Sequence, residues 1–178
     1  IGLVTAGVLS QIDYTRFREF KVVLYGSSIV LIFATWAFGG VTRGSRRAIQ
    51  LPFFEVQTSE MVKIFLVLVL ASVVVDRTRE LGRWTTTARI VGLTLVPTGL
   101  VMLQPDLGSA LVYLACALAI LFLAAVPWHH ITALIAAGLA AIVFTLGIGP
   151  AVGINVLHDY QVERLTAFLN PTENRADE

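Results

Sequence analysis

The sequence predicts an all-α fold, a polytopic bundle of helices that cross a membrane. Hydrophobic residues make up 56% of the chain and charged residues only 14%, and the mean hydropathy is +0.79. This composition is far from that of a water-soluble globular domain. The stretch between Arg89 and Asp106 contains no Asp, Glu, Lys or Arg, and neither does residues 107–158. Because one span needs about 20 apolar residues, the second stretch has room for two helices.

Five complete spans are expected along the chain. They cover residues 22–42, 59–75, 85–103, 107–126 and 131–149. The cluster Pro127–His130 is expected to supply the turn between the last two. Three tryptophans, Trp36, Trp84 and Trp128, fall near the ends of these spans. An indole ring prefers the headgroup zone of a bilayer, which supports the boundaries.

The two ends of the sequence predict a fragment of a longer protein with a single integral membrane domain over residues 1–178. Residues 1–12 are apolar but too short to cross, and they lack the basic start and cleavage site of a signal peptide. They are expected to be the second half of a helix. Residues 150–178 are expected to be a truncated outer loop, because they end among polar residues without closing a domain.

The loops fall into two groups, because each span reverses the side of the membrane. One group consists of residues 13–21, residues 76–89 and the turn at residues 127–130, and it is dense in Lys and Arg. The other group, which includes Arg43, Arg46 and Arg47, carries its basic residues at lower density. Basic residues favour the cytoplasmic side, so the first group is predicted to be cytoplasmic and the second to lie outside.

Most acidic residues then lie on the outer side, where Glu60 and Lys63 are informative. Thr58 or Ser59 is expected to cap a helix, with Glu60 in its first turn, where an acid suits the helix dipole. Lys63 follows three residues later, so the two side chains share one face and can pair. The structural alternative is a cap with a lysine that snorkels to the interface. The functional alternative is a site, the default for an ionisable residue inside a membrane.

Asp106 lies in a short turn between two apolar stretches, directly after Pro105. It can cap the helix that begins at Leu107. The turn is too short to rise far into water, so Asp106 is expected at the outer edge of the membrane, level with Glu60 and Lys63. If these helices pack side by side, the three residues form a polar cluster at the mouth of the bundle.

Four motifs carry a resemblance to a known family. They are "GSRRAI" at residues 44–49, "QTSEMVKI" at 57–64, "QPDLGSALV" at 104–112 and "HDYQVERLTAFLNP" at 158–171. In this order and spacing they resemble the SEDS family of bacterial cell-wall polymerases, which includes RodA, FtsW and SpoVE. The pair Tyr160 and Gln161 favours the RodA-like branch. The resemblance covers essentially the whole chain.

The resemblance implies a fold of about ten transmembrane helices in the full protein. It implies a peptidoglycan glycosyltransferase that polymerises lipid II at the outer face of the cytoplasmic membrane, in cell elongation or division. Arg46, Arg47 and Lys63 are then expected to contact the diphosphate. Glu60, Gln104 and Asp106 lie on the polar motifs of the outward cavity, and Asp106 is also a catalytic candidate. The catalytic base would be an acid in the large outer loop, within hydrogen-bond reach of the acceptor hydroxyl.

The sequence departs from the family pattern at this base. Counting from "FLNP" places Asn174 where the family usually has the catalytic Asp, and an amide cannot act as a base. Asp177, three residues later, is therefore the expected base if the loop holds a small insertion. Ala48 and Thr58 are two smaller departures, and neither removes an ionisable group.

Two other classes of function stay open at the sequence level. A flippase or transporter of the lipid-linked precursor would also place these groups in a bundle, but it needs a polar path toward the cytoplasm. A non-catalytic scaffold for a transpeptidase would tolerate replacement of the outer acids. The expected partners are lipid II, a class B penicillin-binding protein transpeptidase and membrane lipids, with no nucleic acid. No cofactor is expected, since His129 and His130 lack further ligands at metal-binding spacing, although a divalent cation stays open.

Overall fold

The computed structural model describes residues 18–38, 40–42, 45–50, 55–104 and 106–148. Internal contacts divide the chain into two units, Ile1–Pro127 and Trp128–Glu178. The expected partial helix at residues 1–12 and the expected outer loop at residues 150–178 lie outside the described residues. The single membrane domain over residues 1–178 therefore stays a prediction.

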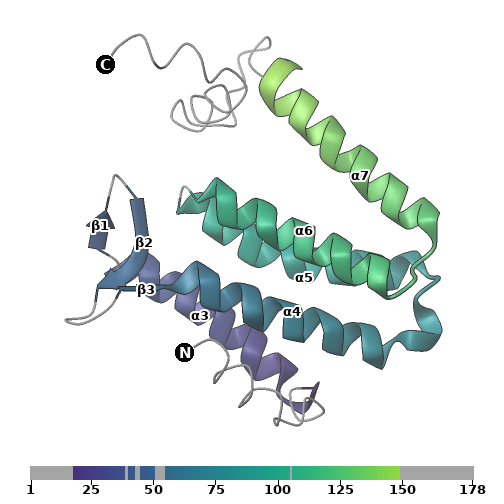
Figure 1. The fold of residues 1–178 in the computed structure, drawn as a ribbon, viewed down its shortest axis with the longest axis horizontal. Coiled ribbons are helices and arrows are strands. Elements are labelled where there is room, and N and C mark those ends of the chain that lie inside the picture. Colours follow the sequence, from purple (N-terminus) through teal and green to yellow (C-terminus); the bar gives the residue numbers. More distant parts are fainter. Residues whose placement is uncertain (1–17, 39, 43–44, 51–54, 105, 149–178) are drawn as a thin grey trace, which may run out of the picture. The chain divides into compact units, whose positions relative to one another are not determined.

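Four long helices form the first unit and lie side by side (Figure 1). Their bounds are Lys21–Phe38 for α3, Thr58–Asp76 for α4, Trp84–Leu103 for α5 and Leu107–Leu123 for α6. α3 packs on α4 and α5, and α6 packs on α4 and α5. By length and composition α4 and α5 can cross a membrane, and α3 and α6 are shorter apolar helices. The predicted helical bundle is confirmed for this unit.

The surface of this unit is apolar over much of its area. Side chains such as Val30, Ile64 and Phe122 are more than half exposed, although each lies within a long helix. A soluble monomer rarely exposes so many large apolar side chains together. A helix surrounded by lipid does so by necessity, because lipid tails are as apolar as leucine.

Two predicted spans end at the wrong residue. The span predicted at 22–42 ends at Phe38, because the chain enters strand β1 at Gly40. The span predicted at 107–126 ends at Leu123, where Ala124 closes the helix and Ala125 takes a positive φ of 53°. The spans at 59–75 and 85–103 match α4 and α5 within one residue at each end.

A three-stranded antiparallel sheet fills part of the connection from α3 to α4, and it was not predicted from the sequence. The strands are β1 (Gly40–Thr42), β2 (Ser45–Gln50) and β3 (Glu55–Gln57), in the order β1-β2-β3. In the register, Val41 faces Arg46 and Ile49 faces Val56. β2 contacts both α3 and α4, so the sheet packs beside the end of α3 and the start of α4 (Figure 1).

Hydroxyl groups inside the bundle mostly bond to their own helix. Ser28, Ser72 and Thr94 each donate to the backbone carbonyl oxygen four residues earlier, at 2.7 to 2.9 Å. Thr35 and Thr98 do the same. A buried hydroxyl without a partner is costly, and this local bond removes the cost without a polar neighbour.

Pro97 breaks the hydrogen-bond ladder in the middle of α5. Proline has no N–H, so the carbonyl oxygen of Leu93, four residues earlier, loses its helical donor. The hydroxyl of Tyr25 on α3 donates to this oxygen at 3.1 Å. A neighbouring helix therefore restores the bond that Pro97 removes, as expected where no water reaches the backbone.

The second unit contains helix α7 (Trp128–Val143), which continues as a short π-helix, Phe144–Ile148. The helix begins at Trp128 and not at residue 131, so the predicted turn at residues 127–130 is wrong at its end. The turn lies earlier, ahead of Trp128. Within α7 the rings of His129 and His130 meet edge to face, with centroids 4.4 Å apart.

Candidate functional site

Asp106 is the N-cap of α6, as the sequence predicts. Its Oδ1 accepts from the backbone N–H of Ser109 at 3.2 Å, and its Oδ2 accepts from the Ser109 hydroxyl at 2.7 Å. The residue is 7% exposed. A carboxylate at this position compensates the unpaired N–H groups at the start of a helix, so both oxygens of a buried acid are held in a fixed direction.

Tyr113, two turns further along α6, joins this helix to the first turn of α4. Its hydroxyl donates to the carbonyl oxygen of Ser59 at 3.0 Å, and its side chain is fully buried. α4 and α6 also pack against each other. The starts of α4 and α6 are therefore neighbours, which is the packing that the predicted polar cluster requires. Tyr113 was not predicted from the sequence.

Neither Thr58 nor Ser59 caps α4, so that prediction is wrong. The N-cap is Gln57, which makes no side-chain capping bond. The Thr58 hydroxyl bonds instead to the hydroxyl of Thr35 on α3, at 2.5 Å. The Ser59 hydroxyl is buried and has no hydrogen-bond partner among the described residues. Because α3 packs against this turn, the Thr58 hydroxyl makes a hydrogen bond to α3 in place of the capping bond that it could make in an isolated helix.

The predicted pair of Glu60 and Lys63 is confirmed. Lys63 Nζ donates to Glu60 Oε1 at 2.5 Å along one face of α4. The Lys63 side chain is 22% exposed and the Glu60 side chain 56%. The pair is therefore open on the glutamate side, and a ligand can reach it.

Gln104 ends α5 and is buried. Its Nε2 donates to the carbonyl oxygen of Ile32 on α3 at 2.6 Å. The amide thus fixes the end of α5 to α3, two residues before Asp106 in the sequence. Its predicted role in substrate binding stays a prediction.

The remaining predicted site residues cannot be placed in this cluster. Arg46 and Arg47 lie in β2, where the described part of the structure gives the backbone register alone. Asp177 and Asn174 lie outside the described residues. The part of the chain that the structure describes contains no group of three or more His, Cys, Asp or Glu side chains able to hold a metal ion.

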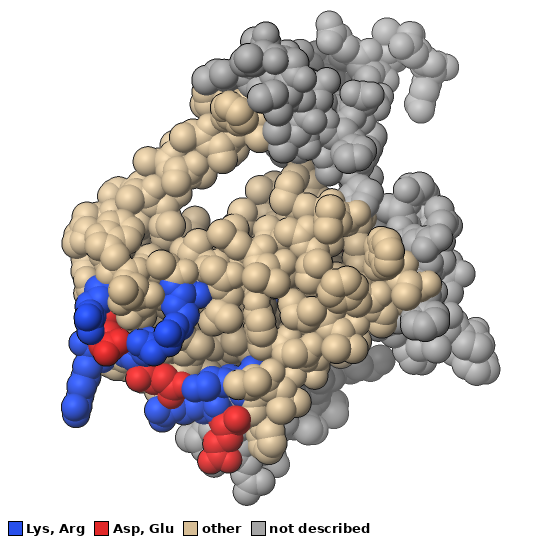
Figure 2. All heavy atoms as spheres, turned by 180° about the vertical axis from the view of Figure 1, so that it is seen from behind, with Lys and Arg blue, Asp and Glu red and all other residues tan. Residues whose placement is uncertain are grey.

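Charged side chains gather at the end of the first unit that lies away from Asp106 (Figure 2). Arg18 and Lys21 both donate to the carboxylate of Asp76 at the end of α4. This bond joins two of the loops that the sequence analysis assigned to one side of the membrane. The next cationic side chains, Arg77 and Arg89, lie beside it. The two loops therefore share one side, as predicted.

All 178 residues match the family of cell cycle proteins that groups FtsW, RodA and SpoVE. The chain belongs to this family. This is the SEDS family, which the four sequence motifs resemble. The members of this family are membrane proteins, and helices α4 and α5 are long and apolar enough to cross a membrane. The chain is therefore part of a membrane protein.

Curated relatives in the family are similar over nearly the whole chain. A probable peptidoglycan glycosyltransferase FtsW of Coxiella burnetii is 32% identical over 96% of this chain and 44% of its own length. The peptidoglycan glycosyltransferase MrdB of Escherichia coli is 30% identical over 96% of this chain and 44% of its own. The chain thus spans less than half the length of these relatives.

Solved structures give the same result. One chain in a structure of a peptidoglycan synthase complex, described as coordinating polymerization and crosslinking, matches 98% of this chain over 49% of its own length, with a TM-score of 0.74 and 32% identity. The rod shape determining protein RodA of Thermus thermophilus matches 78% of this chain and 46% of its own, with a TM-score of 0.64 and 33% identity. Both likenesses support the family fold.

Proposed function

We propose that this chain is part of a peptidoglycan glycosyltransferase that polymerises lipid II into glycan strands. The observation that carries the proposal is the buried carboxylate of Asp106, held by two hydrogen bonds from Ser109 at the same end of an apolar bundle as Glu60 and Lys63. A membrane-anchored substrate with a diphosphate and a sugar brings its polar part to this level. The names of the relatives as peptidoglycan glycosyltransferases support this choice of reaction.

In the proposed reaction, an acceptor sugar hydroxyl attacks the anomeric carbon of the donor. The new glycosidic bond forms as the bond from that carbon to the diphosphate breaks, and the hydroxyl proton passes to a base. Asp177 is the proposed base. Lys63, Arg46 and Arg47 are the proposed diphosphate contacts, because Lys and Arg bind phosphate oxygens through charge-assisted hydrogen bonds.

Glu60 and Asp106 have an orienting role in this proposal. Glu60 holds Lys63 through the 2.5 Å bond, so the ammonium group is fixed before substrate binds. Asp106 is itself fixed by Ser109. Groups that are already oriented lose no further freedom when charge moves in the reaction, which is the main source of electrostatic catalysis.

The proposed location is the bacterial cytoplasmic membrane, with the Asp106 end outside and the Asp76 end in the cytoplasm. The density of basic residues at the Asp76 end supports this orientation. Single cysteines can be placed at Arg79 and at Gln57 in full-length protein whose Cys116 is replaced by Ser. A thiol reagent that cannot cross the membrane should label position 57 in intact spheroplasts and position 79 only after lysis. Labelling of both positions from outside contradicts the orientation.

We propose a transpeptidase of the penicillin-binding protein class as partner. The similar solved complex couples polymerization to crosslinking, which supports a partner of this kind. The precursor-transporter alternative needs a polar path toward the cytoplasm, and the hydroxyl groups of Ser28, Ser72, Thr94 and Thr98 give it little support, because each of them bonds to its own helix.

The decisive experiment is polymerisation of labelled lipid II by purified full-length protein with its transpeptidase. Asp177→Ala should lower the yield of polymer at least about tenfold, because a general base contributes about 100-fold or more. Lys63→Ala should also lower it at least about tenfold, because a hydrogen bond to a charged group contributes about 1.5–3 kcal/mol. Glu19→Gln is the matched control, since Glu19 is an exposed acid at the other end of the bundle. Unchanged yield from both site variants, with properly folded protein, would support a scaffold and remove the proposed roles.

A further inference from the structure

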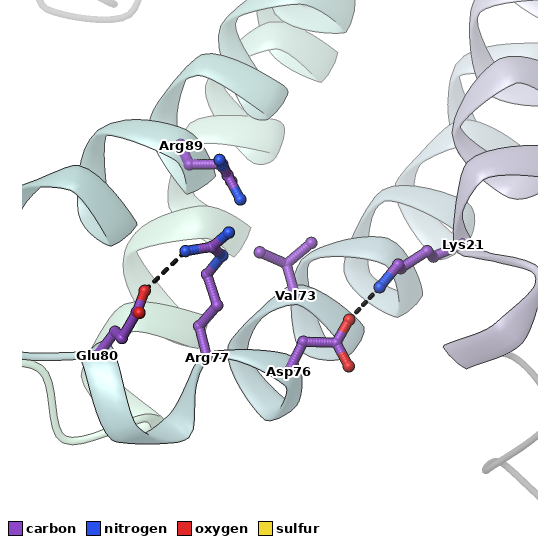
Figure 3. A pocket seen from close by; sticks show the side chains of 6 residues that line it. All are labelled: Lys21, Val73, Asp76, Arg77, Glu80 and Arg89. Carbon is purple, nitrogen blue, oxygen red and sulfur yellow. Dashed lines mark hydrogen bonds and ion pairs between the residues drawn. The ribbon is translucent and has the colours of Figure 1, made fainter.

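A pocket of about 350 Å³ lies at the charged end of the first unit, away from the Asp106 region (Figure 3). It is bounded by the start of α3, the end of α4 and the start of α5. Its lining residues are Lys21, Val73, Asp76, Arg77, Glu80 and Arg89. Three side chains in this lining are cationic and two are carboxylates.

Both carboxylates are already bonded to more than one cation. Asp76 accepts from Lys21 and from Arg18. Glu80 Oε2 accepts from Arg77 at 2.7 Å, and its Oε1 lies 3.7 Å from Arg83. Four cations therefore share two acids. The acids of the pocket do not neutralise its positive charge.

Arg89 adds to this excess. Its side chain makes no hydrogen bond or ion pair with the described residues, and it reaches the pocket from the first turns of α5. In Figure 3 the guanidinium group of Arg89 points toward that of Arg77. Two guanidinium groups that face each other repel unless an anion lies between them. Each presents a planar fork of donors that matches phosphate oxygens.

The position of the pocket indicates which kind of molecule would bring a phosphate group to these arginines. α4 ends at Asp76 and α5 begins at Trp84, so the pocket lies where two spans reach the headgroup layer. Val75 and Trp84 beside it are 55% and 49% exposed, and an indole prefers that layer. Val73 provides an apolar wall. A lipid offers a phosphate at this depth together with acyl chains for the apolar surface.

We propose that this pocket binds the phosphate group of an anionic phospholipid, held between Arg77 and Arg89. Basic pockets between transmembrane helices on the cytoplasmic side recognise such headgroups. The inference does not depend on the reaction proposed above, because it uses none of the residues at the Asp106 end. A bound lipid would neutralise the facing arginines and tie the loop at residues 77–83 to α5.

The test is native mass spectrometry of full-length protein in detergent with added cardiolipin, phosphatidylglycerol or phosphatidylethanolamine. The two anionic lipids should be retained more strongly than phosphatidylethanolamine. Arg77→Gln and Arg89→Gln should each lower the affinity about fivefold, which corresponds to about 1 kcal/mol for one arginine near an anionic surface. Arg79→Gln is the matched control, because Arg79 lies in the same loop but does not line the pocket.

Glu80→Gln is a second variant, for which the expected result is a gain of lipid binding. An unfolded protein would not show such a gain. Glu80 competes with a lipid phosphate for Arg77, so its removal should raise the retention of anionic lipid. Equal losses from Arg79→Gln and Arg89→Gln would contradict the pocket and indicate general attraction to charge. Inorganic phosphate that displaces cardiolipin at millimolar concentration would also overturn the proposal, because the ligand would then be a soluble anion.

Discussion

The hydroxyl of Tyr113 donates a hydrogen bond to the backbone carbonyl oxygen of Ser59, 3.0 Å away, and thereby fixes the start of α4 against α6. At the other end of the bundle Tyr25 makes the same kind of bond to Leu93. The two bonds differ in one respect. The Ser59 oxygen is also paired within α4, whereas the Leu93 oxygen has lost its helical donor to Pro97.

This difference predicts unequal costs for removing the two hydroxyl groups. Tyr113→Phe should lower the free energy of unfolding by about 1 kcal/mol, the usual value of one hydrogen bond. Tyr25→Phe should cost about 1–3 kcal/mol, because it leaves a partly buried carbonyl oxygen without any donor. Unfolding in mixed micelles with increasing dodecyl sulfate measures both. A larger loss from Tyr113→Phe than from Tyr25→Phe would show that Pro97 does not set the cost.

The same two variants should separate function from stability. Tyr113 lies beside the proposed site and Tyr25 does not. Polymerisation of lipid II by Tyr113→Phe should therefore fall in spite of its smaller structural cost, while Tyr25→Phe should keep its activity under conditions where it is folded. The reverse order of activities would place the active groups elsewhere in the bundle.

Gln104→Ala should act on stability. The substitution removes the 2.6 Å bond from Nε2 to the carbonyl oxygen of Ile32 and frees the buried α5–α6 turn. We expect a loss of about 1–2 kcal/mol in the free energy of unfolding. If the variant unfolds like the natural protein but binds lipid II less tightly, Gln104 contacts substrate and the structural interpretation is wrong.

Lys63→Gln should give the opposite pattern. An ion pair at this spacing with a half-exposed partner contributes only about 0.2–0.5 kcal/mol, so the free energy of unfolding should hardly change. Binding of a lipid diphosphate should weaken, because the charge proposed to hold it is gone. Titration of the protein with undecaprenyl diphosphate in nanodiscs measures this affinity. Equal affinity of the natural protein and of Lys63→Gln for the lipid diphosphate would contradict this role and leave Lys63 as a lysine that snorkels to the membrane interface.

The sequence predicted the helices of the bundle because their signal is local. Runs of apolar residues between charged turns predict α4 and α5 within one residue. The ends of α3 and α6 were less well predicted, since a strand at Gly40 and a turn at Ala125 depend on tertiary contacts as well as on hydropathy. The sheet was missed for the same reason. Its short strands carry little alternation of polar and apolar residues to indicate them.

The site was predicted in part. Asp106 and the pair of Glu60 and Lys63 depend on spacing along one helix, and the structure confirms both arrangements. Tyr113 was missed, because one tyrosine in an apolar run gives no sign that it bonds across to α4. The supposed cap at Thr58 failed since its partner, Thr35, comes from a different helix. Long-range pairings of this kind need the packing to be known.

The central claim is that the charge of Asp106, and not only its capping bonds, serves polymerisation. Asn is as good an N-cap as Asp, whereas Ala costs about 1 kcal/mol. In lipid II polymerisation by full-length protein and its transpeptidase, Asp106→Asn should lose at least about tenfold in rate while its free energy of unfolding stays within about 0.5 kcal/mol of the natural protein. Full activity of Asp106→Asn, with loss confined to Asp106→Ala, would reduce Asp106 to a helix cap and contradict the claim.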